Sequence, residues 1–466
     1  MRTDDRRPNI VFILADDLGF GDLAAVNGGL SETPFLDQFM AESVSIEHQY
    51  AASPVCNPSR ASLLTGRYPH RTGSIDTLEW RGLERLALDE ITVADVLSGA
   101  GYHTAHIGKW HLGAFDKRYS PRQRGFAESV CFRGGGHDYF DWRLEYNDVP
   151  VVSDGRYLTD VWTDEAVAFI ERQRGGGPFF LNLCYNAPHT PLQVPEEDAQ
   201  VFRDTGLFSE DVSKLYGMIR RLDFGIGRVL EALEKAGIED NTVVVFTSDN
   251  GPEFMSDYLT TPTHTERFNS HLRGSKGSVY EGGIRVPLLI RWPEALPSGE
   301  TRSFMSHFTD WFTTLITIAQ GGVPQDRVID GVNLLPALQG ETDELPDERF
   351  WQWNRYSPVP SCNAAVRSGD WKLIYPEIPE AMKVHDVEWL QVSMYEPEYF
   401  EQNGIILDPD PHRTLSPPAQ PQLFNIAEDP LELTDRAADN PEIVRRLKEK
   451  IENWFDDVEN DRARLR

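Results

Sequence analysis

Acidic, amide and basic side chains stand at several points of this sequence where a predicted strand ends. They are Asp16 and Asp17, Lys109 and His111, His189, and Asp249 and Asn250. Open α/β sheets bind ligands at the carboxyl ends of their parallel strands, so we expect these side chains to meet at one edge of a sheet. Taken singly, each also fits a structural role, as a turn cap, a solvated lysine or a hydrogen-bonded core histidine. Their recurrence at strand ends favours one shared polar site.

Four of these residues have the donor atoms of a hard-cation site. Asp16, Asp17, Asp249 and Asn250 supply only oxygen atoms, three of them on carboxylates. Such ligands suit Ca²⁺ or Mg²⁺ and not zinc or copper. Calcium coordination is flexible and accepts ligands from separate loops, whereas magnesium requires a stricter octahedron. We therefore expect one Ca²⁺ per chain, with Mg²⁺ as the alternative.

A further candidate for chemistry lies at the expected start of a helix. Asn57 is the predicted N-cap, Pro58 the first helical residue and Gly66 the end. Cys56 would then precede a helix N-terminus, where free N–H groups and the helix dipole favour an anion. Arg60 adds a bidentate donor in the first turn. A small buried cysteine at a packed helix entry is the structural alternative.

The elements that must position these residues alternate in type from residue 9 to about 340. This alternation predicts an α/β domain around a large, mostly parallel sheet flanked by helices. The expected strands are Asn9–Leu14, Thr104–Ile107, Pro178–Cys184, Thr242–Thr247 and Val286–Arg291. The expected helices are Leu36–Ser43, Thr92–Gly99, Asp164–Arg174, Ser213–Lys235 and Asp310–Ala319.

The acidic stretch Gly340–Glu348 interrupts this alternation. We predict a catalytic α/β domain over residues 1–345 and a smaller C-terminal α+β subdomain over residues 346–466. Its expected elements are two antiparallel strand segments, of which the second folds into a hairpin at residues 368–370, and a terminal amphipathic helix: Phe350–Trp353, Ala364–Tyr375 and Pro441–Phe455.

The amino-acid composition argues against binding to nucleic acids or anionic membranes, against a membrane-spanning segment and against a disulfide framework. The 466 residues carry 45 Lys plus Arg against 74 Asp plus Glu, a net charge of −29, which repels nucleic acids and anionic membranes. Apolar runs stay far below the roughly 20 residues of a membrane helix. The early apolar run Asn9–Ala15 ends in two aspartates, unlike a secretory signal. We expect a cytoplasmic location for the chain as given, or a periplasmic or secreted one if a signal was removed. The four cysteines are too dispersed for a disulfide framework.

The residues that follow Cys56 resemble a known signature. The Cys-x-Pro-Ser-Arg run Cys56–Arg60, which continues to Thr65–Arg67, looks like the signature of the type I, formylglycine-dependent sulfatases of the alkaline-phosphatase-like superfamily. Further blocks follow the order of that family and extend the resemblance over nearly the whole chain: Asn9–Gly19, Gly108–Gly113, Ala187–Pro191, Ser248–Glu253, Arg273–Pro287 and Leu423–Asp435. The resemblance implies an alkaline-phosphatase-like fold.

The resemblance also implies the nucleophile and the metal ligands. Cys56 matches the position that is oxidised to formylglycine, an aldehyde whose hydrate is the nucleophile. Asp16, Asp17, Asp249 and Asn250 match the calcium ligands, and the hydrate at position 56 completes the shell.

Five other residues match catalytic positions of the same family. Arg60 and Lys109 match the residues that hold the hydrate, and His111 matches the base that later collapses it. His189 and Lys276 match the residues that bind the sulfate and the leaving group.

These matches imply a sulfatase that hydrolyses a sulfate monoester, on a carbohydrate or an aryl alcohol. Its expected partners are a sulfated small molecule or saccharide and a formylglycine-generating or radical maturation enzyme. Loops that hold His, Arg and aromatic residues suit either sugar binding or packing: Cys131–Trp142, Phe254–His271 and Phe350–Asn363. One alternative is a phosphonate monoester or phosphodiester hydrolase with the same nucleophile. Another is a calcium-dependent carbohydrate-binding protein in which Cys56 remains a thiol.

Overall fold

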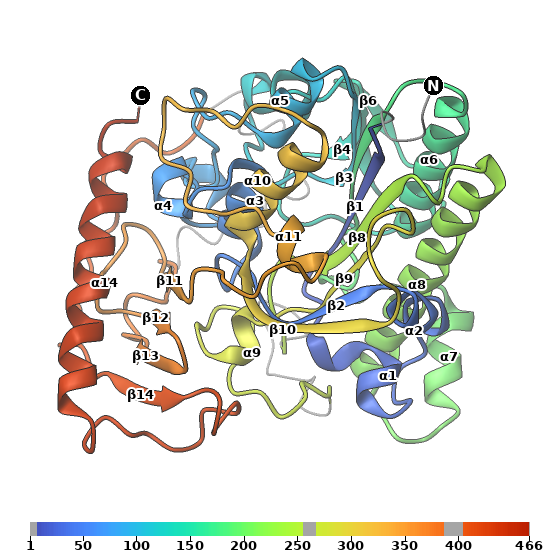
Figure 1. Cartoon of the computed structure of the whole chain (residues 1–466). Coiled ribbons are helices and arrows are strands. Elements are labelled where there is room, and N and C mark those ends of the chain that lie inside the picture. Colours follow the sequence, from blue (N-terminus) through green and yellow to red (C-terminus); the bar gives the residue numbers. More distant parts are fainter. Residues whose placement is uncertain (1–6, 255–266, 386–403, 466) are drawn as a thin grey trace.

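A ten-stranded sheet forms the centre of the computed structural model, which describes residues 7–254, 267–385 and 404–465 (Figure 1). Its strand order is β10-β2-β9-β8-β1-β7-β3-β4-β5-β6. The five central strands β8, β1, β7, β3 and β4 are parallel to one another. The strand bounds are β1 Asn9–Ala15, β2 Val44–Tyr50, β3 His103–Lys109, β4 Glu128–Phe132, β5 Arg143–Tyr146, β6 Val149–Val152, β7 Phe179–Cys184, β8 Thr242–Ser248, β9 Leu288–Arg291 and β10 Glu300–His307.

Helices cover both faces of this sheet, which explains why its central strands are almost continuously apolar. Along β1, Val11 and Ile13 face one hydrophobic cluster, while Ile10 and Phe12 face the other. The first cluster includes residues of α2 Pro34–Ala41, α6 Leu158–Gln173, α7 Glu196–Arg203 and α8 Glu210–Ala236. The second includes residues of α3 Cys56–Thr65, α5 Val93–Gly99, α10 Phe308–Ile318 and α11 Leu335–Leu338. The remaining short helices are α1 Ala24–Asn27, α4 Pro69–Thr72 and α9 Glu281–Ile284.

A second, four-stranded antiparallel sheet follows in the chain, in the order β11-β12-β13-β14. Its strands are β11 Glu348–Gln352, β12 Ala364–Ser368, β13 Trp371–Tyr375 and β14 Gln422–Asn425. The predicted hairpin is confirmed, because β12 and β13 pair antiparallel across the turn at Gly369. Helix α14 Pro441–Arg462 runs along the outside of this sheet (Figure 1) and buries Leu447 and Ile451 against it.

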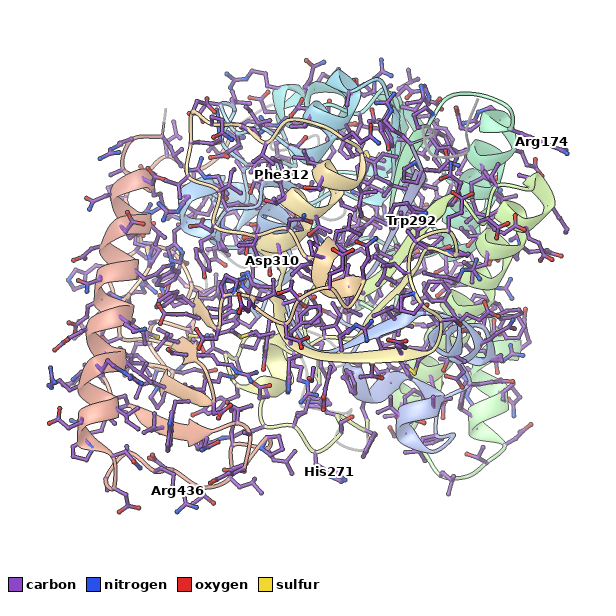
Figure 2. All side chains as sticks on the ribbon, in the orientation of Figure 1. Arg174, His271, Trp292, Asp310, Phe312 and Arg436 are labelled. Atoms are coloured by element: carbon purple, nitrogen blue, oxygen red, sulfur yellow. The ribbon has the colours of Figure 1, made fainter. Side chains whose placement is uncertain are left out.

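The two sheets are joined by packing and by buried ion pairs. Asp310, labelled on α10 in Figure 2, accepts hydrogen bonds from Nη2 of Arg349 on β11 at 2.8 and 3.1 Å. Trp351 packs edge-on against Tyr50 of β2, with ring centroids 5.3 Å apart. The small sheet begins at Glu348. The division into domains at residue 345 stays a prediction.

Several strands differ from the sequence-based expectation. The segment Val286–Arg291 is a strand only from Leu288, and β9 pairs antiparallel with β8 and β2. The described residues between β8 and β9 contain no helix long enough to carry the chain back across the sheet. The chain therefore re-enters the sheet at the edge where β8 ends, and β9 runs in the opposite direction. Strands β2, β4, β5, β6 and β10 were not expected, because they are short or carry polar residues in alternation.

In the described part of the chain, no helix has both the length and the apolar character that crossing a membrane requires.

Candidate active site

The polar residues predicted at strand ends do meet at one edge of the large sheet. Asp16 and Asp17 follow β1, Asp249 and Asn250 follow β8, and His189 lies beyond β7. Lys109 is the last residue of β3. Strand β1 lies between β7 and β8, and β3 lies beyond β7, so these carboxyl ends are adjacent. The parallel arrangement therefore converts residues scattered over more than 200 positions into one cluster.

Asp17 is held by its backbone conformation and by two side-chain hydrogen bonds. It has φ +63°, a left-handed conformation that is costly for a side chain larger than glycine. Its Oδ1 accepts a hydrogen bond from Nδ2 of Asn250 at 2.7 Å, and its Oδ2 accepts one from Nζ of Lys276 at 2.7 Å. Burial raises the pKa of Asp17, but Lys276, His189 and Lys109 outweigh burial and hold this pKa well below its usual range. The carboxylate is therefore ionised.

Cys56 is the first residue of α3, and only 3 % of it is exposed. The expectation that Asn57 caps this helix is wrong, since the N-cap is Val55 and Asn57 lies inside the first turn. The Asn57 Nδ2 group instead donates to the backbone oxygens of Glu84 and His111, both at 2.6 Å. A cap needs a side chain outside the helix, whereas this amide ties the start of α3 to the neighbouring loops.

Two buried cations surround the Cys56 side of the cluster. Arg60 donates through Nε to Oδ2 of Asp249 at 2.8 Å, and its Nη2 lies 2.7 Å from the same oxygen. Nζ of Lys109 lies 2.5 Å from Oδ2 of Asp16. Burial raises the pKa of the Cys56 thiol, and the nearby Lys109 only partly opposes that shift. The unmodified side chain is therefore a neutral thiol, a poor nucleophile.

The donor set fits a divalent cation. One oxygen of Asp16, one of Asp249 and the sulfur of Cys56 all lie within 4.8 Å of one another, and a second such group joins Asp16, Asp17 and His189. Oδ1 of Asp16 and Oδ1 of Asn250 are buried and accept no hydrogen bond from the described residues. Buried oxygen acceptors without partners are costly unless an ion or water satisfies them. Burial, followed by the charge of Asp16, raises the pKa of Asp249 to about 6, as expected for a buried carboxylate close to another carboxylate.

Two histidines complete the cluster, and both are held neutral. Burial, together with the cations Lys276 and Lys109, lowers the pKa of His189 to about 3. Burial and the same kind of cationic surroundings lower the pKa of His111 well below its usual value. Nδ1 of His189 lies 2.7 Å from the carbonyl oxygen of Thr190, which can only accept, so this nitrogen carries the proton. Neutral imidazoles can accept protons during a reaction.

All ten residues expected at the site are thus buried at, or in contact with, one cluster: Asp16, Asp17, Cys56, Arg60, Lys109, His111, His189, Asp249, Asn250 and Lys276. Glu79 was not among the expected site residues, yet its Oε1 lies 3.7 Å from Nε2 of His111. The one feature of the sequence that pointed to Glu79 was its place in the segment that follows Cys56. Of the loop Phe254–His271, residues 255–266 lie outside the described part of the chain.

Comparisons with known proteins identify the family of this chain. A family model described as Sulfatase matches residues 8–321, and one described as N-sulphoglucosamine sulphohydrolase, C-terminal, matches residues 273–390. The chain is 30% identical to arylsulfatase J of Mus musculus, over 96% of this chain and 76% of that protein. It is 35% identical to N-acetylgalactosamine-6-sulfatase of Sus scrofa, over 73% of this chain and 67% of that protein.

A solved structure with the same fold is also similar in sequence. The crystal structure of Ps i-CgsB in complex with k-i-k-neocarrahexaose superimposes with a TM-score of 0.79 and 31% identity, covering 96% of this chain and 93% of that one. The expected alkaline-phosphatase-like fold is confirmed, and so is the expectation of an enzyme over that of a binding protein alone. The chain belongs to the sulfatase family and is a sulfuric ester hydrolase.

Proposed function

We propose that this enzyme hydrolyses the sulfate monoester of a saccharide through a formylglycine formed from Cys56. The observation that carries the proposal is the position of Cys56, at the start of α3 and within 4.8 Å of carboxylate oxygens of Asp16 and Asp249. A saccharide substrate is supported by the similarity to an N-acetylgalactosamine-6-sulfatase and to a structure solved with a neocarrahexaose. Aryl sulfates are a second class of expected substrate, in keeping with the similarity to arylsulfatase J.

The proposed cofactor is one Ca²⁺, held by Asp16, Asp17, Asp249 and Asn250 together with residue 56. Their hard oxygen atoms, two of them buried without a hydrogen-bond partner in the described structure, favour Ca²⁺ over softer metals. The bound ion would act as a Lewis acid toward sulfate oxygens, and the hydrated aldehyde would supply the nucleophile. Mg²⁺ is the alternative ion, with less tolerance for ligands from three separate segments.

Arg60 and Lys109 have the role of holding residue 56 in place. Each is already fixed by a buried carboxylate, Arg60 by Asp249 and Lys109 by Asp16. Nη1 of Arg60 also donates to the backbone oxygen of Lys109 at 2.9 Å, so the Arg60 side chain is linked to the end of β3 that carries Lys109. Preorganised donors of this kind stabilise charge that develops in a transition state without having to reorient.

His111 is assigned as the base that removes the proton of the remaining hydroxyl at position 56, so that sulfate is released. Its pKa is lowered by burial and by Lys109 and Arg60, which keeps the ring unprotonated and ready to accept. The φ of +56° at His111 shows that the surrounding structure holds this residue in an unusual backbone conformation.

His189 and Lys276 are assigned to the sulfate and the leaving oxygen. The Nε2 atom of His189 lies 3.8 Å from Oδ2 of Asp17, the oxygen that also accepts from Lys276. In the free enzyme His189 is neutral, because burial and Lys276 lower its pKa to about 3. An anionic ester beside the ring opposes these cations and favours the protonated form, which can then donate to the leaving oxygen.

Local charge favours an anionic substrate despite the net charge of −29. The carboxylates of Asp16, Asp17 and Asp249 are matched by the cations Arg60, Lys109 and Lys276. A bound divalent ion therefore leaves the site positive, and the low dielectric of a buried site strengthens its attraction for a sulfate.

Peptide mass spectrometry across Cys56 tests the nucleophile. We expect protein produced with a formylglycine-generating or radical maturation enzyme to contain the aldehyde, which lowers the peptide mass, and to hydrolyse p-nitrophenyl sulfate. Cys56→Ala should abolish turnover while the melting temperature stays close to that of the parent, because only one buried sulfur is lost. The control Cys362→Ala removes a buried cysteine from a separate cluster and should keep full activity.

The outcomes separate the remaining hypotheses. An active preparation that retains the thiol at residue 56 would contradict the proposed nucleophile. A much larger kcat/KM for a p-nitrophenyl phosphonate than for the sulfate would assign the enzyme to phosphonate ester hydrolysis instead.

A further inference from the structure

Behind His111 lies a buried carboxylate that the proposed mechanism does not use. Glu79 is 4 % exposed and begins the short 3-10 helix Glu79–Arg81. Its Oε1 lies 3.7 Å from Nε2 of His111. The same oxygen accepts a hydrogen bond from the backbone N–H of Gly135. The carboxylate is thus fixed by the loop that follows β4, with its charge directed at the imidazole ring.

The backbone of His111 is fixed from two sides, while its ring is not. The N–H of His111 donates to the oxygen of Arg133 at 3.1 Å, and its carbonyl accepts from Nδ2 of Asn57 at 2.6 Å. Neither ring nitrogen has a hydrogen-bond partner among the described residues. The orientation and tautomer of the ring must therefore be set by the groups packed around it.

Two glycines allow Glu79 and His111 to approach each other. A Cβ atom on Gly135 would lie 2.6 Å from Cε1 and 2.7 Å from Nε2 of His111, and 3.2 Å from Oε1 of Glu79. A Cβ atom on Gly134 would lie 3.2 Å from the same carboxylate oxygen. Any other residue at position 135 would push a methyl or larger group between the carboxylate and the ring, so glycine keeps this contact open.

The charges around His111 explain what the Glu79 carboxylate can contribute. Burial has the largest effect on the pKa of His111, and the next largest come from Lys109, Arg60, His189 and Lys276, all of which disfavour a protonated ring. A base surrounded by cations accepts a proton only if some group offsets the charge that it gains. Glu79 can do so, because its carboxylate lies within ion-pair distance of Nε2.

Glu84 provides a natural comparison in the same loop. It is fully buried, and its Oε1 accepts a hydrogen bond from the N–H of Ala114 at 2.8 Å. Burial raises the pKa of Glu84 to about 8, so this carboxyl is mostly protonated near neutral pH and adds little charge. Glu79 and Glu84 are therefore two buried glutamates of which only the first contacts the base.

We propose that Glu79 is a positioning residue for His111, which keeps the proton of the neutral ring on Nε2 and leaves Nδ1 as the proton acceptor. This inference rests on the proposed role of His111. In the reaction the Nδ1 lone pair takes the proton of the remaining hydroxyl at residue 56 while the C–O bond to sulfate breaks and the aldehyde C=O forms, and the Glu79 carboxylate offsets the charge of the resulting imidazolium. The separation of 3.7 Å is longer than a hydrogen bond, as is common for catalytic pairs without a bound substrate. Which imidazole nitrogen holds the proton is in general set by the partner of the other nitrogen.

Imidazole nitrogen NMR on the Cys56→Ala protein tests the tautomer without any aldehyde present. The His111 resonances are assigned by their loss in His111→Asn. We expect the Nε2–H form in the parent and in Glu84→Gln, and a substantial Nδ1–H population in Glu79→Gln. Glutamine keeps the acceptor for Gly135 and loses only the charge, so a purely structural role would leave the tautomer unchanged.

Kinetics of the aldehyde-bearing enzyme give the second readout. Glu79→Gln should lower kcat about 10- to 100-fold with KM within about two-fold, as is typical when the group that orients a catalytic histidine is lost. Glu79→Asp, which keeps the charge, should recover part of this loss, and Glu84→Gln should match the parent. If Glu79→Gln does not fold, Gly135→Ala offers the same test, because its methyl group displaces the ring from an intact carboxylate.

An unchanged tautomer in Glu79→Gln, or a kcat equal to that of the parent, would overturn the proposal. A parent enzyme that is inert toward every sulfate ester would instead refute the proposed function, whereas the tautomer measurement would still stand.

Discussion

At the scale of single residues, the protonation state of each buried side chain in the site is set by its charged neighbours. Burial raises the pKa of Asp17, yet Lys276 and His189 hold this pKa well below its usual range, and Lys276 reaches the carboxylate at 2.7 Å. Lys276 and Lys109, which help to keep Asp17 ionised, together with burial also keep His189 neutral near pH 7. A single substitution in this group therefore changes the protonation of its neighbours as well as its own contact.

His189→Ala separates the leaving-group role from simple sulfate binding. Because p-nitrophenolate is a good leaving group that needs little protonation, we expect kcat for p-nitrophenyl sulfate to fall by less than about 10-fold. The kcat for a sulfated saccharide, whose alkoxide is a poor leaving group, should fall by at least about 100-fold. Parallel steady-state kinetics on both substrates measure the difference. Equal losses on the two substrates would show that His189 acts in binding only.

At the scale of elements, helix α3 carries Cys56 at its start and ends at Gly66, which has φ +72°. A Cβ atom on Gly66 would lie 2.8 Å from Cβ of Phe312, which is labelled on α10 in Figure 2. The end of α3 is therefore both conformationally restricted and closely packed against the next layer.

Gly66→Ala and Gly237→Ala form a matched pair that isolates this packing. Gly237 ends α8 with φ +65° and has no atom within 4 Å of an added Cβ among the described residues. We expect Gly237→Ala to lower the free energy of unfolding by about 1 kcal/mol, because alanine is disfavoured in this left-handed backbone conformation. Gly66→Ala should lower the free energy of unfolding by about 2–4 kcal/mol, because overpacking against Phe312 adds to the same conformational penalty. Urea unfolding measures the free energy of unfolding of both variants. Equal losses would show that α10 shifts to make room for the extra methyl group.

At the scale of the whole molecule, a buried ion triad ties the two sheets together. Nζ of Lys372, on β13, lies 2.8 Å from Glu281 of α9 and 2.9 Å from Glu432, and all three side chains are fully buried. Burial raises the pKa of Glu281, but Lys372, Arg285 and Arg367 outweigh it and hold this pKa well below its usual range. The residues of the small sheet are thus bonded to the segment between β8 and β9 that also carries Lys276.

Lys372→Met tests this connection through its pH dependence. A carboxyl whose pKa is lowered by folding stabilises the protein above its unfolded pKa and loses that contribution as pH falls toward its folded pKa. We therefore expect Lys372→Met to lower the free energy of unfolding by about 3–5 kcal/mol at pH 7, where the ionised Glu281 and the buried Glu432, whose pKa burial raises to about 7, both lose their contact with Lys372. The cost should be smaller near pH 5, where one of them can protonate.

Urea unfolding at the two pH values checks this prediction. Lys214→Met is the control, because Lys214 makes an exposed pair with Glu210 at 3.4 Å, and it should change stability by less than about 0.5 kcal/mol. A cost for Lys372→Met that does not vary with pH would contradict the electrostatic explanation.

The sequence by itself determined the class of fold and four of the five central strands, and together with the family resemblance it selected ten residues that meet at the site. Continuous apolar runs such as Phe179–Cys184 can be satisfied only between two layers of helices, and polar residues after such strands must collect at one edge. The hairpin around Gly369 followed from local turn chemistry.

Only the tertiary structure decided the features that depend on which segments become neighbours. The antiparallel direction of β9 follows from where the chain re-enters the sheet, which no local pattern encodes. Asn57 is a typical N-cap residue, yet its amide bonds two distant carbonyl groups instead of capping α3. Glu79 looked like any loop glutamate until folding brought it within 3.7 Å of His111. Contacts of this kind depend on distances across the folded molecule, whereas a linear sequence records only spacing along the chain.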